Sequence, residues 1–354
     1  MATIRQLTFV GPRQLEWREV EAPRIETGDD ALVEPLAVAR CDLDFYIAIG
    51  GYRTPGPFAL GHEMTAVVTE VGDSVKHVST GDRVIVPFQI HCGTCDNCRR
   101  GWTNACTRVP PFAAFGLGTN RERDFGGGFS DAVRVPFADA MLLPLPEGVS
   151  PEAACGLGDN VADGYRTVAP SLAEFPGESV LVVGGLAQSV GLYAVHAAVA
   201  LGAAKVTYTD YDERRLALAE AAGAEALETD YAKERQAAKE SLITVDASGT
   251  PDGISFAMRS TAPCGTCTSV TAGLSSTAEV PLNYAYMRGL NYKVGRVHSR
   301  AVLPSVIELV TSGALDPLAI LSRTAPFDDA PQALLDPSPK LIFTRGHSAP
   351  PEPQ

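Results

Sequence analysis

Four of the eight cysteines in this chain lie within fifteen residues, in the stretch HCGTCDNCRRGWTNACTR. Their spacing, C-x2-C-x2-C-x7-C, is formed by Cys92, Cys95, Cys98 and Cys106. Four thiolates spaced in this way can surround Zn²⁺ tetrahedrally, and a site closed by four protein ligands shapes a loop without binding substrate. The sequence therefore predicts a structural zinc lobe over about residues 91–108. The alternative is a set of four unrelated surface thiols.

A second C-x2-C pair is formed by Cys264 and Cys267. No other pair lies nearby to complete a set of four ligands. The residues around the second cysteine, TCTSV at 266–270, are typical of a strand. We therefore expect this pair to have no metal-binding role.

Length and composition restrict the class of protein. The 354 residues suffice for roughly two domains, and 45% apolar with 20% charged residues is ordinary for a globular protein. The net charge of −13 argues against a nucleic-acid partner, because phosphates repel an acidic surface. We see neither a signal peptide nor an apolar run of the ~20 residues that span a membrane. The expectation is a cytoplasmic protein, with thiols kept reduced and no membrane partner.

The character of the sequence changes near residue 160. Before it, short strand-like runs such as ALVEPLAVA and DRVIVPF are broken by Gly and Pro, which favours an antiparallel, barrel-like domain. After it, strand-like runs such as SVLVVGG and KVTYTD alternate with helical segments, which favours a parallel, doubly wound sheet. The tail HSAPPEPQ has the composition of a disordered segment.

A glycine-rich turn follows the first strand of the second domain. Backbone N–H groups at a helix start attract a pyrophosphate, but the usual G-x-G-x-x-G is not intact, so a plain tight turn is the alternative. The next strand ends at Asp210, 19 residues after Gly191, where a carboxylate can bind ribose hydroxyls and repel a 2′-phosphate. This favours NAD over NADP, although Asp210 could instead be a helix N-cap. The candidate cofactor residues are Gly184, Gly185, Ser189, Val190, Gly191, Asp210 and Arg215.

These motifs together resemble the zinc-dependent medium-chain alcohol dehydrogenases over nearly the whole chain. GHE at 61–63, the four-cysteine lobe, GDRV at 81–84 and the nucleotide domain occur in family order. GGLAQSVGLYAV and GRVHSRA are most similar to the formaldehyde-dehydrogenase-like branch. The resemblance implies an α/β protein with a GroES-like, mainly-β catalytic domain and a Rossmann domain. It implies residues 1–160 and 297–354 for the first domain and 161–296 for the second.

The resemblance also implies a second zinc, which takes part in catalysis. Its ligands would be Cys41 in RCDLD, His62 in GHE and Asp159 in CGLGDNVADGY. One thiolate, one imidazole and one carboxylate leave the fourth position open for water or substrate. Cys155 is the alternative to Asp159, and Cys41 and His62 could instead be ordinary buried residues.

Residues close to these ligands both follow and depart from the family pattern. Glu63 would bind the zinc transiently during ligand exchange, and Asp44 would hydrogen-bond the second nitrogen of His62. The family usually has a Ser or Thr that relays a proton where this chain has Leu43, which has no donor or acceptor. Tyr46 could take over that relay through water. Asp163 stands where the family usually has a Thr close to the nicotinamide, and a carboxylate there would favour the oxidised ring.

The sequence thus predicts a zinc-dependent oxidoreductase that transfers a hydride between NAD(H) and an alcohol or carbonyl substrate. Each chain would hold one catalytic and one structural zinc. Because the relay is altered, two alternatives stay open. One keeps the fold and tightly held NAD for dismutation or an internal redox step, and the other is a non-catalytic regulator or binding protein. The resemblance implies a homodimer or homotetramer and a small-molecule substrate. The stretch 110–129 is expected to contribute to the substrate pocket, and the alternative is that its Phe residues belong to the core.

Overall fold

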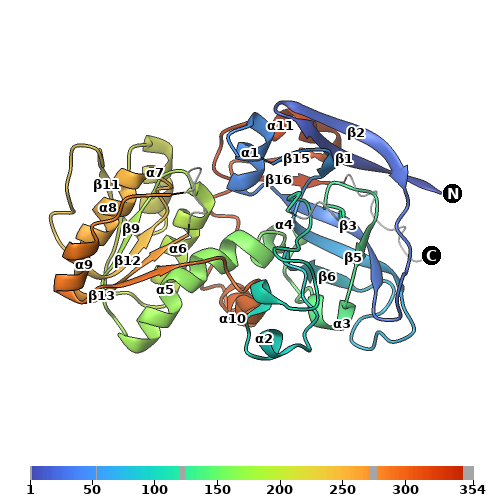
Figure 1. Ribbon diagram of the computed structural model, residues 1–354, viewed down its shortest axis with the longest axis horizontal. Coiled ribbons are helices and arrows are strands. Elements are labelled where there is room, and N and C mark those ends of the chain that lie inside the picture. The colour runs from blue at the N-terminus through green and yellow to red at the C-terminus, as the bar shows by residue number, and fades with distance from the viewer. Residues whose placement is uncertain (1, 53, 120–123, 271–276, 346–354) are drawn as a thin grey trace. The chain divides into compact units, whose positions relative to one another are not determined.

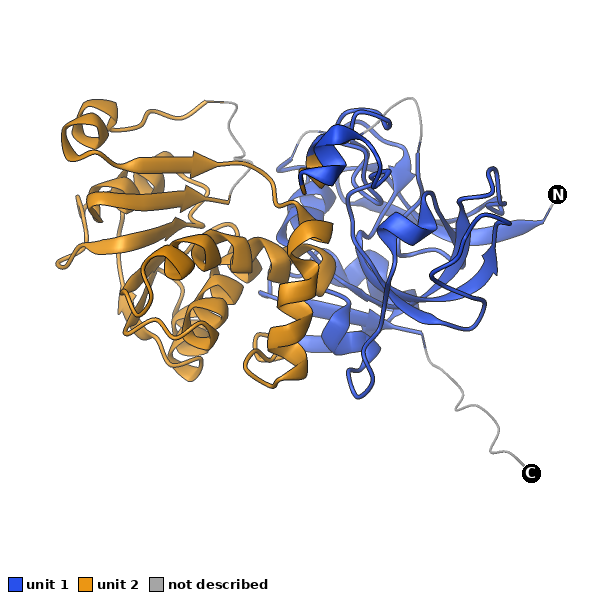
Figure 2. Ribbon diagram, turned by 90° about the horizontal axis from the view of Figure 1, so that it is seen from below, with its two compact units in different colours: residues 1–100, 105–156, 321–354 blue, residues 101–104, 157–320 orange. Residues whose placement is uncertain are grey.

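The computed structural model describes residues 2–52, 54–119, 124–270 and 277–345 (Figure 1). The predicted disordered tail and residues 120–123 of the expected substrate loop lie outside these ranges. Two compact units divide the chain, with residues 1–100, 105–156 and 321–354 in unit 1 and residues 101–104 and 157–320 in unit 2 (Figure 2). Within the described ranges, no helix combines the length and apolar character that crossing a membrane requires.

Unit 1 is built mainly from strands. A three-stranded antiparallel sheet has the order β2-β1-β4, and a seven-stranded sheet has the order β15-β16-β3-β5-β6-β8 with β7 also pairing β3. The bounds are β1 Thr3–Gly11, β2 Gln14–Glu21, β3 Ala31–Ala39, β4 Phe58–Ala59, β5 Glu63–Val71, β6 Arg83–Val86, β7 Val133–Val135, β8 Leu143–Pro144, β15 Arg323–Pro326 and β16 Leu341–Thr344. Short helices complete the unit: α1 Asp42–Ile49, α2 Asp96–Arg99, α3 Ala138–Met141, α4 Pro151–Ala154 and α11 Ala330–Ala333.

The central strand β3 determines which residues meet at one end of the larger sheet. It is buried at all but one position, because β5, β7 and β16 all pair with it. Ala39, its last residue, lies opposite Glu63 on β5 and Ile342 on β16. The residues just beyond these strand ends therefore come together, although they are far apart in sequence.

Unit 2 contains a six-stranded parallel sheet in the order β11-β10-β9-β12-β13-β14. The strands are β9 Val180–Val183, β10 Val206–Asp210, β11 Glu225–Glu228, β12 Ser241–Asp246, β13 Thr261–Ser269 and β14 Asn291–Val294. Counted along the chain, this is the order 3-2-1-4-5-6 of a doubly wound dinucleotide-binding fold. Strand β9 is apolar and buried throughout, and β12 is buried at all but one position, as expected for strands covered on both faces.

The helices of unit 2 follow from the parallel connections. Because such crossovers are right-handed, the helices after β9 and β10 lie on one face and those after β12 and β13 on the other. They are α6 Gln188–Ala200, α7 Glu213–Ala221, α8 Pro251–Arg259 and α9 Leu282–Arg288, preceded by a π-helix, Leu157–Val161, and α5 Ala162–Glu174 (Figure 1). α5 packs along α6.

The bounds of the compact units are not those predicted for the two domains, which stay a prediction. Residues 157–160 belong to unit 2, and unit 1 resumes at residue 321 where the sequence indicated 297. The reason is α10, Ser299–Thr311, which packs against α5 and the π-helix of unit 2. The second C-x2-C pair lies on β13, with Cys264 exposed and Cys267 buried.

Candidate functional site

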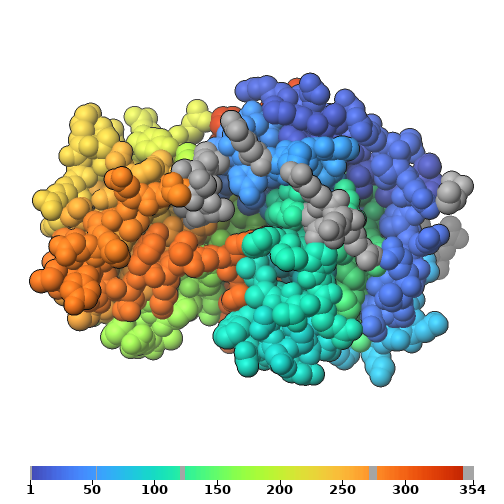
Figure 3. Space-filling view, viewed as in Figure 1, coloured from blue at the N-terminus to red at the C-terminus, as the bar shows by residue number. Residues whose placement is uncertain are grey.

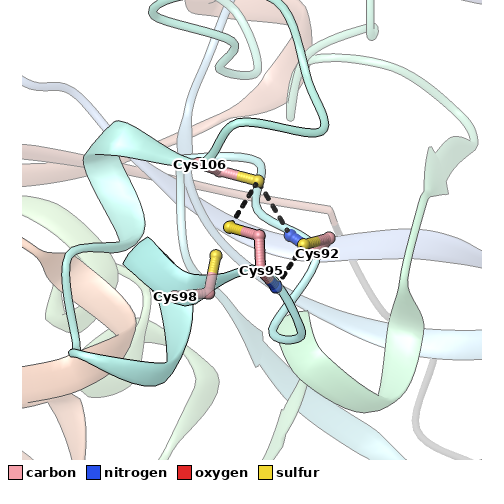
Figure 4. Close-up of side chains that lie close together, drawn as sticks. All are labelled: Cys92, Cys95, Cys98 and Cys106. Carbon is pink, nitrogen blue, oxygen red and sulfur yellow. Dashed lines mark hydrogen bonds between the residues drawn. The ribbon is translucent and has the colours of Figure 1, made fainter.

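The four cysteines of the lobe converge in unit 1. Cys95 caps α2, which carries Cys98 in its first turn, and the chain returns through a short 3-10 helix to Cys106. The four Sγ atoms lie within 4.8 Å of one another and point toward a common centre (Figure 4). The lobe lies at the surface of the face drawn in Figure 3. The side chains of Asp96 and Arg99, on α2 of the lobe, are exposed.

Backbone N–H groups stabilise the ionised form of two of these thiols, which is the form that binds a metal cation. The N–H groups of Thr94 and Cys95 donate to Cys92 Sγ at 3.4 and 3.3 Å. The N–H groups of Thr107 and Cys98 lower the pKa of Cys95 to about 5, whereas burial raises the pKa of Cys98. Thiolates this close repel one another unless a divalent cation balances them. The donor set therefore fits structural zinc.

A second group of candidate ligands lies where β3 ends and the antiparallel strand β5 begins. Cys41 follows β3 and caps α1, and His62 immediately precedes β5. Cys41 Sγ and a ring nitrogen of His62 lie within 4.8 Å, and both side chains are buried. Asp44 links the two, because its Oδ2 accepts from the Cys41 backbone N–H at 3.0 Å and its Oδ1 lies 3.2 Å from His62 Nδ1.

The glycine of the GHE motif has a steric role. Gly61 has a φ of +90°, a conformation that L side chains rarely adopt. A Cβ there would lie 2.7 Å from the Phe129 ring and 3.0 Å from the Phe129 backbone nitrogen. A glycine is therefore required just before His62 for the chain to turn into β5.

Glu63, the third residue of that motif, is fully buried and forms an ion pair with the buried Lys340. Lys340 lies just before β16, at the same end of the sheet. Cys155 lies nearby in unit 1 and its thiol donates to the Glu152 carbonyl at 3.2 Å, within its own helix region. Burial and the charge of Glu63 raise the pKa of Cys155.

Sequence reasoning missed two buried cations in this region, Lys340 and Arg40. Arg40 is fully buried and donates to the backbone carbonyls of Asp336 and Ser338. Burial lowers its pKa, and the carboxylates of Asp42 and Asp44 oppose that shift. The only signal in the sequence was a cation directly before Cys41, inside an otherwise apolar run.

The two residues considered for the proton relay lie on α1. Leu43 is half-buried, and its backbone N–H donates to Cys41 Sγ at 3.5 Å. The half-buried Tyr46 ring packs edge-on against Phe45, with ring centroids 5.3 Å apart. A role for Tyr46 in proton transfer therefore stays a prediction.

Asp159 lies in unit 2, on the π-helix that precedes α5. Its side chain is buried and accepts from Asn160 Nδ2 at 2.9 Å. Single π-helical turns are often found at functional sites. Its place beside Cys41 and His62 stays a prediction, because those residues belong to the other unit.

The glycine-rich turn of unit 2 is held by the protein itself. A Cβ on Gly184 would lie 2.3 Å from both Asp210 Oδ2 and the Tyr208 hydroxyl. The N–H groups of Leu186 and Ala187 donate to the carbonyls of Ser248 and Ala247 at 2.9 and 3.1 Å. These two N–H groups are therefore not offered to a pyrophosphate, and a cofactor role for Ser189, Val190 and Gly191, in the first turn of α6, stays a prediction.

Asp210 ends β10 as expected, but its carboxylate is already surrounded by donors. Arg215 donates to both of its oxygens, at 2.6 and 2.8 Å, and the Tyr208 hydroxyl donates at 2.6 Å. The backbone N–H groups of Tyr211 and Asp212 add 2.7 and 3.1 Å bonds. A carboxylate offers about four lone-pair sites, so these five donors fill it. The alternative reading of Asp210 as the helix N-cap is wrong, because Asp212 caps α7.

Comparison with known proteins adds to this geometry. Two family profiles match the chain, an alcohol dehydrogenase GroES-like domain over residues 27–147 and a zinc-binding dehydrogenase over residues 189–312. A Mycobacterium tuberculosis protein named as a probable zinc-binding alcohol dehydrogenase is 32% identical over 313 residues, 87% of this chain and 78% of that protein.

Two further matches concern substrate and cofactor. A Pseudomonas aeruginosa protein named glutathione-independent formaldehyde dehydrogenase is 32% identical over 237 residues, 64% of this chain and 58% of that protein. The acetophenone reductase of Geotrichum candidum, solved in complex with NAD, is 25% identical with a TM-score of 0.82 over 97% of both chains.

A mainly-β unit with a cysteine lobe and a unit with a parallel nucleotide-binding sheet define a two-domain oxidoreductase. The chain belongs to the zinc-binding alcohol dehydrogenase family. The predicted fold class, GroES-like plus Rossmann, is thereby confirmed, and the family is one of zinc-binding dehydrogenases.

Removing one thiol from the lobe should remove one zinc. We expect Cys98→Ala to lose one zinc equivalent per chain, because three thiolates no longer close the site. Elemental analysis of protein prepared in metal-free buffer measures this. The matched control is Cys264→Ala, an exposed cysteine on β13, which should keep the full zinc content. Equal zinc in both variants would contradict the structural site.

Breaking the Asp210 pair should destabilise unit 2. We expect Asp210→Asn to lower the free energy of unfolding by about 3 kcal/mol, because it leaves the buried Arg215 guanidinium without its charge partner. Urea unfolding measures the change. Asp230→Asn breaks an exposed pair with Lys233 and should leave the midpoint where it is. If the two variants unfold alike, Asp210 has no such structural role.

Proposed function

We propose that this family member transfers a hydride between NAD(H) and an alcohol or carbonyl substrate at a catalytic zinc. The observation that carries the proposal is the buried Asp44 carboxylate, which accepts from the Cys41 backbone N–H and lies 3.2 Å from His62 Nδ1. A carboxylate on Nδ1 fixes the imidazole tautomer and leaves Nε2 to bind a metal. Asp159 is the proposed third ligand, supported by the family resemblance and by its buried place on a π-helical turn.

The buried charges of unit 1 also fit a divalent cation. Close to Cys41 and His62, the carboxylates of Asp42, Asp44 and Glu63 outnumber the cations of Arg40 and Lys340 by one. Ionisation of Cys41 adds a second negative charge. Uncompensated charge is costly to bury, so a doubly charged cation is the species that balances this region.

Zinc bound there would supply Lewis-acid chemistry, and the nicotinamide would accept the hydride. The chain's own residues do the rest. Asp44 orients His62, and Lys340 holds the Glu63 carboxylate, which is proposed to bind the metal only during ligand exchange. Leu43 cannot carry the alcohol proton. Tyr46, one turn further along α1, is the proposed carrier.

NAD(H) is the proposed cofactor in preference to NADP(H). Arg215 pairs with Asp210 at the end of β10, where the adenosine ribose is expected, and its donors are turned toward Asp210 and Gln188. Burial opposes its charge, but the hydrogen bonds and charge of Asp210 raise the pKa of Arg215. A guanidinium committed in this way is not offered to a 2′-phosphate. The NAD-bound reductase noted above is consistent with this choice.

The formaldehyde-dehydrogenase-like branch is proposed for the substrate class, with a homodimer or homotetramer as the assembly. GGLAQSVGLYAV, GRVHSRA and the similarity to the Pseudomonas enzyme support the branch. The assembly rests on the family resemblance alone. Dismutation and a non-catalytic role gain no support from the described residues.

The proposed catalytic site is tested by comparing the substitution of a metal ligand with the substitution of a residue that orients the ligands. We expect Cys41→Ala to lose one zinc equivalent and to reduce alcohol-dependent NADH formation about a thousandfold, since it removes the Lewis acid. Asp44→Ala should keep the ligands but weaken zinc binding at this site 10–100-fold, on the order found for residues that orient metal ligands. Zinc per chain and absorbance at the NADH band are the measurements.

The matched control for Cys41→Ala is Cys155→Ala, which removes the buried thiol that was the alternative to Asp159 as a ligand. It should retain zinc and activity. Full activity in Cys41→Ala, or zinc loss in the control instead, would refute the Cys41–His62 site.

A further inference from the structure

A buried carboxylate in unit 2 is left unexplained by the zinc site. Asp163 lies in the first turn of α5, with its side chain 14% exposed, and pairs with Arg166 at 2.5 Å. Arg166 also donates to the Gly295 carbonyl at 2.5 Å. Gly295 directly follows Val294, the last residue of β14. The Asp163–Arg166 pair is therefore fixed at the carboxyl end of that strand.

The carboxyl ends of these strands are where a dinucleotide binds. In a sheet of this order, each half of three strands faces one nucleotide, and the ligand spans the point where the order reverses. The half β9–β11 carries the glycine-rich turn and Asp210, which belong to the adenosine side. The half β12–β14 is left for the nicotinamide. Asp163 thus lies on the nicotinamide side of the sheet.

The segment after β14 is held against α5 and the π-helix by further contacts. Ser299 Oγ donates to the Gly158 carbonyl, and the Asn104 N–H donates to His298 Nδ1 at 3.2 Å. The surroundings of Asp163 are therefore well defined within unit 2. The charged groups that act on the Asp163 carboxylate are Arg166 on α5, Asp159 on the π-helix and Arg296 after β14. Burial and the charge of Arg166 lower the pKa of the nearby His298.

We infer that Asp163 makes the site bind the oxidised cofactor more tightly relative to the reduced one. The oxidised nicotinamide ring carries a positive charge and the reduced ring carries none, so a nearby carboxylate stabilises only the oxidised form. The partner Arg166 reduces the effect without reversing it, because removing any negative charge makes the local potential more positive. The inference rests on the proposed use of NAD(H) and adds a residue that sets the redox balance of the bound couple.

The titration of Asp163 supports this assignment. Burial raises the pKa of Asp163 to about 6, with the nearby Arg166 opposing the shift. The carboxylate is therefore ionised at pH 8 and becomes neutral as the pH falls through 6. The preference for the oxidised cofactor should be full at pH 8 and fade below pH 6.

The test is direct cofactor binding to the zinc-loaded, full-length protein. Dissociation constants for NAD⁺ and NADH are measured by calorimetry at pH 8 for the wild type, Asp163→Asn and the control Asp230→Asn. We expect Asp163→Asn to reduce the ratio Kd(NADH)/Kd(NAD⁺) about tenfold, which for a two-electron couple corresponds to about 30 mV in the potential of the bound cofactor. The control removes an exposed carboxylate from a pair of the same i,i+3 spacing and should leave the ratio unchanged.

A purely structural role for Asp163 gives a different result. If Asp163 only braces α5, both dissociation constants rise by the same factor and the ratio stays constant, which overturns the inference. A pH series adds an independent measurement. The wild-type ratio should fall with a midpoint near pH 6, whereas Asp163→Asn should show no such midpoint. An identical pH dependence in both proteins would also overturn it.

A second variant covers the case in which Asp163→Asn fails to fold. Arg166→Gln keeps the carboxylate and removes its partner, so the ratio at pH 8 should equal or exceed that of the wild type, with a midpoint above pH 6. A ratio below the wild-type value would contradict the inference. If the wild type binds neither NAD⁺ nor NADH, the proposed NAD-dependent function fails. Tight binding with an unchanged ratio refutes only the role of Asp163.

Discussion

The antiparallel pairing of β3 with β5 is the constraint on which the proposed metal site depends. Ala39 opposite Glu63 sets the register, and Cys41 and His62 lie just beyond these two residues. A slip of one residue would turn each side chain to the other face of the sheet, so the ligand pair requires this register. The pairing of Ile342 on β16 with Ala39 brings Lys340 to the same end. One set of backbone hydrogen bonds thereby places a thiol, an imidazole, a carboxylate and an ammonium together.

The sequence alone was sufficient to predict the types of secondary structure in each part of the chain and the local motifs. Apolar runs and alternating helices predicted the mainly-β part and the doubly wound part, because strand and helix periodicity is a local property. The four-cysteine lobe was equally readable, since its ligands are close in sequence. The bounds of the compact units could not be predicted in this way. α10 packs with unit 2 through contacts with the π-helix and α5, and no local signal at residue 297 indicates these contacts.

Contacts between residues that are distant in sequence could not be predicted from the sequence either. Lys340 pairs with Glu63 across 277 positions, and Arg40 donates to carbonyls nearly 300 residues away. Nothing in the local sequence distinguishes such a buried cation from a surface one. The filled carboxylate of Asp210 shows the same limit, because its position at the strand end was predictable but the convergence of five donors required the packed structure.

The nucleotide-binding end of unit 2 explains why a disrupted glycine motif is tolerated. In an intact motif, loop N–H groups are left for the phosphates, whereas here Leu186 and Ala187 donate to the segment after β12. That segment is itself fixed, because the buried Asp246 accepts from the N–H and hydroxyl of Ser248 and from the hydroxyl of Ser269. The loop is therefore held before any cofactor arrives. A loop already held in place reduces the ordering cost of binding, and the charged pairs Asp210–Arg215 and Asp163–Arg166 are the ones that we propose select the cofactor and its redox state.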